Sequence, residues 1–143
     1  MDGSIATLAG AVIGGIIGIA GTYLGSVYLV KKQRFFDAGQ RLREAFHAEL
    51  AILCDPSDTS DPTDILKAAF KKHLSAVAEF RYILSCCRLD GFNKAWREYH
   101  CYENTCDQFL EQYSKHLGGT DLAKENRKLA VKRIEHVLSF TNP

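Results

Sequence analysis

The N-terminal part of this sequence lacks charge. Between Ser4 and Val30 there is no Asp, Glu, Lys or Arg. A run of this length exceeds the about 20 apolar residues that a helix needs to cross the hydrocarbon core of a bilayer. A helix is also the one single segment that satisfies its own backbone hydrogen bonds there. The run predicts a transmembrane helix and sets residues 1–30 apart as an N-terminal segment.

The chain also lacks the basic start of a cleaved signal peptide, whose apolar core would span about 7–15 residues. It begins Met-Asp-Gly-Ser, and the longer apolar run ends at a basic cluster. This pattern is typical of a stop-transfer anchor. Because basic residues stay on the cytoplasmic side, we expect the N-terminus outside and residues 31–143 in the cytosol. The expected membrane-interface anchors are Tyr28, Lys31, Lys32 and Arg34.

Large side chains are absent from one side of the predicted span. Small residues recur there at four-residue spacing, with a second pair on a neighbouring line: Ala6, Gly10, Gly14, Gly18 and Thr22, then Gly21 and Gly25. Residues four apart share a helix face. Such faces let helix backbones approach closely in lipid. We expect this face to bind a second copy of the chain or a helix of another membrane protein.

The rest of the chain lacks an excess of either charge. Residues 31–143 hold all 18 Lys and Arg and all but one of the 17 Asp and Glu residues. This balance argues against nucleic acid as a partner, since domains that bind it are typically strongly basic. The length of this part lies in the usual range for one domain. Its last basic stretch, from Lys124 to Arg133, is interpreted as a solvated helix face.

Hydrophobic spacing in residues 31–143 is helical throughout, which predicts an all-α fold. No Pro or Gly interrupts residues 30–36, so the first helix is expected to continue from the membrane to about Leu53. Asp61 followed by Pro62 predicts the start of a second helix, which is expected to end near Cys87.

The remaining sequence predicts two more helices. The third is expected from about Phe92 to Leu117, ended by two glycines. The fourth is expected to begin at Thr120 or Asp121. Four helices with short connections predict an antiparallel cytosolic bundle.

Recognisable metal spacing is missing from the cysteines. The five are Cys54, Cys86, Cys87, Cys101 and Cys106, with no C-x2-C pair among them. A zinc site therefore has no support. The odd number and the predicted reducing compartment argue against a disulfide framework. Cys101 is expected to be a partly exposed thiol.

Catalytic patterns are also missing. Glu44 and His47 form a single Glu-x-x-His, whereas a di-iron bundle needs two, and there is no GxxxxGK[ST] phosphate loop. His73 lies on the apolar stripe of the second helix, where a pair with Cys106 is conceivable. A hydrogen-bonded core histidine is the more ordinary interpretation. The sequence predicts no enzyme activity and no cofactor, and no small-molecule substrate is evident.

The third predicted helix is rich in aromatic residues. Tyr and Trp often anchor protein interfaces, so a partner surface is possible at Trp96, Tyr99, Tyr102 and Tyr113. Packing of the same rings in the core is the favoured interpretation, and a surplus aromatic edge would form the partner surface.

Together these features predict a single-pass membrane scaffold or interaction protein that contacts membrane lipid and associates through its small-residue face. Two alternatives stay open. One is a membrane-active effector whose glycine-rich helices permeabilise the bilayer. The more distant one is a membrane-anchored thiol enzyme.

Overall fold

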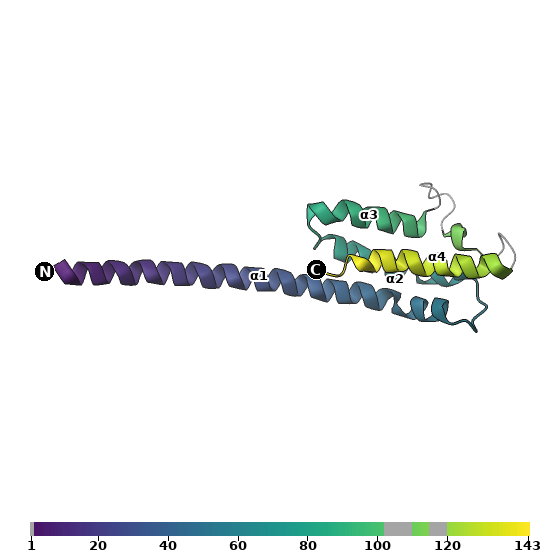
Figure 1. Ribbon diagram of the computed structural model, residues 1–143, viewed down its shortest axis with the longest axis horizontal. Helices are drawn as coiled ribbons and strands as arrows, with labels where there is room; N and C mark the ends of the chain where they lie inside the picture. Colours follow the sequence, from purple (N-terminus) through teal and green to yellow (C-terminus); the bar gives the residue numbers. More distant parts are fainter. Residues whose placement is uncertain (1, 102–109, 115–119) are drawn as a thin grey trace. The chain divides into compact units, whose positions relative to one another are not determined.

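The computed structural model describes residues 2–101, 110–114 and 120–143, with side chains from residue 25 in the first helix and from residue 123 in the last. The described residues are helical and contain no strand. The helices are α1 (Asp2–Cys54), α2 (Pro62–Arg81), α3 (Cys86–His100) and α4 (Thr120–Ser139), with a short 3-10 helix, η1 (Glu111–Tyr113) (Figure 1). The predicted all-α class is confirmed.

The chain divides into two units, Met1–Arg34 and Phe35–Pro143. The sequence had placed the boundary after Val30. Helix α1 contributes to both units without a break in its backbone. Among the residues with described side chains, no helix is both long and apolar enough to cross a membrane.

In the second unit, α1 buries one apolar stripe of its surface. Leu42, Phe46 and Leu53 are buried at spacings of four and seven residues, which keeps them on one helix face. Gly39 lies on the same face and is closely approached: a Cβ added there would lie 3.3 Å from the Thr141 Cβ. Glycine at this position therefore allows the chain after α4 to pack against α1.

Helix α2 begins where the sequence placed it. Asp61 is in the extended conformation of an N-cap, and its carboxylate accepts a hydrogen bond from the Thr63 N–H at 2.9 Å. The helix ends at Arg81, so the predicted end near Cys87 is wrong. The backbone carbonyl of Ser85, in extended conformation, accepts from the N–H groups of Arg88 and Leu89 and begins α3.

The prediction of a helix from Phe92 to Leu117 is also wrong. Helix α3 begins at Cys86, continues through Gly91, and ends at His100. Gly91 acts there as a packing residue, since a Cβ added to it would lie 3.2 Å from the Phe140 ring. Helical geometry has ended at Cys101, which is extended, and Leu110 has a left-handed φ of 57°. The predicted glycine cap at residues 118–119 lies outside the described residues.

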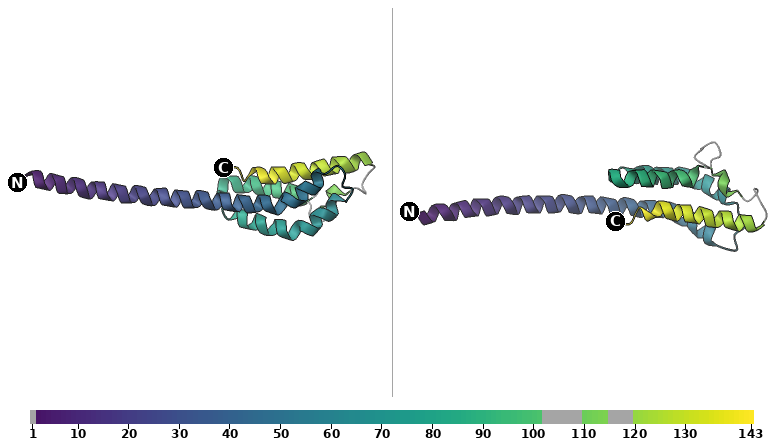
Figure 2. Two further views of the ribbon diagram at one scale, coloured as in Figure 1. Left: turned by 90° about the horizontal axis from the view of Figure 1, so that it is seen from below. Right: turned by 45° about the horizontal axis from the view of Figure 1, so that its top comes forward.

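The four helices of the second unit alternate in direction, as the sequence predicted. The part of α1 in the second unit begins at Phe35, whose ring lies 5.6 Å from that of Phe80 at the end of α2, measured between centroids. Phe80 in turn lies 5.3 Å from Phe92 at the start of α3. Phe92 lies 5.7 Å from Phe140, which follows α4. Figures 1 and 2 show α2, α3 and α4 side by side in this bundle.

Four arginines fasten the ends and connections of the bundle by donating to backbone carbonyls. Arg43 reaches the Thr141 carbonyl oxygen, and Arg88 donates to those of Phe140 and Asn142. Arg127 and Arg133 bind carbonyls outside their own helix. The interpretation of the basic stretch of α4 as a solvated face is therefore wrong at these last two positions.

Candidate functional site

The residues proposed for helix association lie almost entirely outside the described side chains. Of that set, only Gly25 is described, and a Cβ added to it would meet no atom within 4 Å. The proposed association face from Ala6 to Thr22 therefore stays a prediction. Among the interface anchors, Tyr28 is 66% exposed, and Leu29 and Val30 beside it are exposed as well.

The possible aromatic partner surface is not a surface. Trp96, Tyr99 and Tyr113 are all buried, and Tyr102 lies outside the described residues. Trp96 stacks on Phe70 with ring centroids 5.7 Å apart. The interpretation in which these rings pack in the core describes the three residues correctly. Helix α2 covers Trp96 and Tyr99 of α3, and Tyr113 of η1 packs beside Tyr99 with ring centroids 6.4 Å apart.

A polar network crosses the centre of the bundle. His73 is fully buried and lies against the Phe46 ring, with centroids 3.9 Å apart. Its Nδ1 is 2.9 Å from the Tyr99 hydroxyl, and its Nε2 is 3.4 Å from a Glu49 carboxylate oxygen. Lys72 donates to both oxygens of Glu49. Both ring nitrogens of His73 thus have partners, as expected for a core histidine; Cys106, its conceivable catalytic partner, lies outside the described residues.

Burial shifts the pKa values of the residues in this network. It lowers the pKa of His73, and the hydrogen bond and negative charge of Glu49 only partly oppose this. Burial also acts to raise the pKa of Glu49, but hydrogen bonds from Lys72, its own N–H and His73 together hold that pKa below its usual value. Burial raises the pKa of Tyr99 far above its ordinary range. The network is therefore neutral at the histidine and anionic at the glutamate near neutral pH.

We expect acid to destabilise the bundle through His73. Its folded pKa is lowered from 6.5, so below this pH the unfolded chain binds more protons and the free energy of unfolding falls. The fall reaches at most about 1.4 kcal/mol per pH unit for one group. Urea unfolding from pH 8 to pH 5 measures it.

The matched variants for this titration are His73→Gln and His136→Gln. His73→Gln should flatten the fall below pH 6.5, whereas His136→Gln changes an exposed imidazole that pairs with Glu98 and should retain it. An identical pH dependence in the wild type and His73→Gln would contradict the assignment.

The cysteines differ from the prediction at one position. Cys54, Cys86 and Cys87 are exposed free thiols. Cys101 is only 3% exposed and takes part in a disulfide, so the expectation of a partly exposed thiol is wrong. The helical periodicity behind that expectation ends at His100, and Cys101 turns inward from an extended backbone. Cys106 lies outside the described residues, and no group of metal-binding side chains occurs in the described part of the chain.

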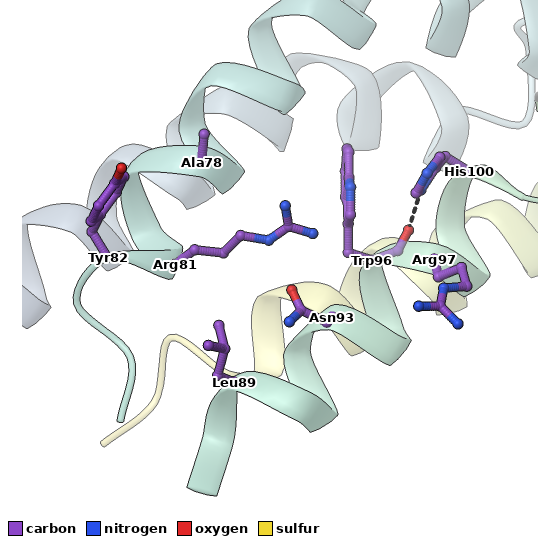
Figure 3. Close-up of a pocket in the computed structure, with 8 residues that line it drawn as sticks. All are labelled: Ala78, Arg81, Tyr82, Leu89, Asn93, Trp96, Arg97 and His100. Carbon is purple, nitrogen blue, oxygen red and sulfur yellow. Dashed lines mark hydrogen bonds between the residues drawn. The ribbon is translucent and has the colours of Figure 1, made fainter. Parts of the chain in front are cut away.

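A groove lies between α2 and α3. Its volume is about 830 Å³, within the range of about 300–1,000 Å³ usual for ligand sites. Figure 3 shows Arg81 extending from α2 toward α3, with Asn93 and Trp96 on the facing wall. The eight lining residues are Ala78, Arg81, Tyr82, Leu89, Asn93, Trp96, Arg97 and His100.

No pattern within a single helix indicates this groove, because its walls come from two separate helices. The available signal was the spacing of the five α3 residues, which share one helix face. Fold and geometry thus define a helical-bundle protein with a buried polar network and a basic groove. Comparison of the chain with protein-family models, curated proteins and solved structures found no match.

Proposed function

We propose that this chain is a membrane-anchored helical interaction protein. The observation that carries the proposal is the charge-free run of residues 4–30, followed directly by Lys31, Lys32 and Arg34. This run lies in the same helix, α1, whose last part enters the packed bundle. The run has the length of a transmembrane segment, and the bundle supplies an independently packed domain.

The mechanism is confinement. An anchor restricts the bundle to the plane of the membrane and so raises its effective concentration toward a partner or a second copy. The small residues from Ala6 to Gly25 supply a face for lateral association. The basic cluster Lys31, Lys32 and Arg34 favours the cytoplasmic side for the bundle.

The oligomeric state of the full-length chain in lipid nanodiscs tests this function. We expect a defined oligomer that Gly14→Leu combined with Gly18→Leu disrupts, because leucine side chains hold the helix backbones apart. Ile16→Leu with Ile19→Leu is the matched control on the other face and should retain the oligomer. Circular dichroism should show an unchanged bundle in both variants.

A wild-type chain that stays monomeric and captures no membrane protein would contradict the association proposal. If the oligomer forms, leakage of a dye from vesicles separates the two membrane functions. Intact vesicles support the scaffold, and leakage abolished by the glycine substitutions supports the effector.

The redox state of Cys101 in intact cells tests the orientation. Cytosolic thiols are kept reduced, so the proposed cytosolic placement implies a free thiol at Cys101 after acid quenching and alkylation. The disulfide described for Cys101 is the form expected in an oxidising compartment. A disulfide at Cys101 in intact cells would contradict the proposed cytosolic orientation of the bundle. It would not contradict the proposed membrane anchor.

A further inference from the structure

The groove between α2 and α3 has a distinct charge. Arg81 and Arg97 contribute two guanidinium groups, and none of the eight lining residues is acidic. Burial lowers the pKa of His100, and the charges of both arginines lower it further, so His100 is neutral near pH 7. The groove therefore carries two permanent positive charges and no internal anion.

These two arginines lack the carboxylate partner that four other cations of the bundle have. Arg41, Lys67, Lys72 and Arg127 each pair with a carboxylate. Neither Arg81 nor Arg97 has an ion pair within the described part of the chain. Burial also lowers the pKa of Arg81, which means that its guanidinium has lost hydration without gaining a counter-charge.

Two polar atoms in the groove are buried without hydrogen-bond partners. They are Nε of Arg81 and Oδ1 of Asn93, and within the described residues they are the two side-chain atoms in this condition. Buried polar atoms are usually satisfied, so each exception calls for an explanation. One is a donor from α2 and the other an acceptor from α3, and both line the same recess (Figure 3).

We propose that this groove binds a small phosphate monoester. Arginine is suited to phosphate oxygens because its planar fork can donate two parallel hydrogen bonds. The phosphate binds the Arg81 guanidinium inside the groove and the exposed Arg97 guanidinium at its rim, and a hydroxyl of the same ligand donates to Asn93 Oδ1. Two guanidiniums match the nearly double negative charge of a monoester near pH 7. This binding is independent of the membrane anchor and goes beyond the interaction function.

The chain provides its own reporter for this site. Trp96 lines the groove and is the single tryptophan of the sequence. Titration of the full-length chain in phosphatidylcholine nanodiscs with glycerol phosphate should change its fluorescence in a saturable manner. Sodium chloride at equal ionic strength and glycerol alone should not. Inorganic phosphate should bind more weakly, since it lacks the hydroxyl arm for Asn93.

Three variants locate the site. Arg81→Gln and Arg97→Gln should each raise the dissociation constant about tenfold or more, because each removes a charge-assisted contact. Lys94→Gln is the matched control, since it removes one positive charge from α3 outside the groove lining. Asn93→Asp should abolish binding by placing a negative charge beside the phosphate.

Adding phosphatidic acid to the nanodiscs distinguishes the source of the monoester. A fluorescence change with this lipid, together with a lost response to glycerol phosphate, identifies a lipid headgroup as ligand. An unchanged response identifies a soluble ligand. A non-saturable response, or an equal effect of Lys94→Gln and Arg81→Gln, would overturn the proposal. Neither result bears on the oligomer test of the membrane anchor.

Discussion

Replacing Phe46 by alanine should lower the free energy of unfolding by about 3–5 kcal/mol, the range for a large aromatic removed from a core. Phe46 is 0% exposed and touches both sides of the polar network. Its ring lies 3.9 Å from His73 and 5.6 Å from Tyr99, measured between centroids. The substitution thus opens a cavity beside groups whose hydrogen bonds depend on fixed positions.

Denaturant unfolding of the full-length chain measures this loss. Native domains are stable by only about 5–15 kcal/mol, so the variant should unfold at a much lower denaturant concentration. Phe36→Ala is the control on the same helix, since Phe36 is 42% exposed and should change stability far less. Equal midpoints for Phe46→Ala and the wild type would contradict the central placement of this ring.

Replacing Arg127 by methionine should destabilise the connection between α1 and α2 by about 1.5–3 kcal/mol, the range for hydrogen bonds to a charged group. Its guanidinium donates to the carbonyl oxygens of Ile52, Asp55 and Ser60 at 3.2, 3.2 and 2.8 Å. It also pairs with the Asp58 carboxylate at 3.1 Å. A single side chain of α4 therefore binds the end of α1 and three positions of the connection that follows it.

Limited proteolysis reports this change directly. Cleavage within residues 55–60 should become faster in Arg127→Met, because the connection loses its attachment to α4. Arg127→Lys should recover only part of the protection, since an ammonium group cannot span the same acceptors. Lys128→Met alters the exposed neighbouring residue and should leave cleavage unchanged. Equal cleavage rates in Arg127→Met and Lys128→Met would count against this role.

Periodicity and capping chemistry predicted the starts of α2 and α4 and the buried stripe of α2. Asp61 with Pro62 is a strong local signal, and the α2 stripe repeats over several turns. The predicted bounds of the third helix were wrong because its ends depend on non-local contacts. Gly91 resembles a helix breaker in sequence, yet it is needed for the approach of Phe140 from beyond α4.

The candidate sites were predictable to different degrees. His73 could be placed in the core from its own helix, because its apolar neighbours on the stripe defined the buried face. The groove could not be predicted, since Arg81 and Arg97 each read as solvent-facing cations until α2 and α3 are set beside each other. Single-helix patterns carry no information about a recess between two helices.

The carbonyl-binding arginines have a consequence for how this sequence can diverge. Arg43, Arg88, Arg127 and Arg133 recognise main-chain oxygens, which every amino acid supplies. The segments they hold can therefore accumulate substitutions without losing their attachment, provided that the backbone path is kept. Related sequences should drift at the exposed positions of residues 55–60, whereas Phe140 and Thr141 are constrained by their packing against Gly91 and Gly39. The four arginines should resist exchange even for lysine, whose ammonium lacks the planar fork.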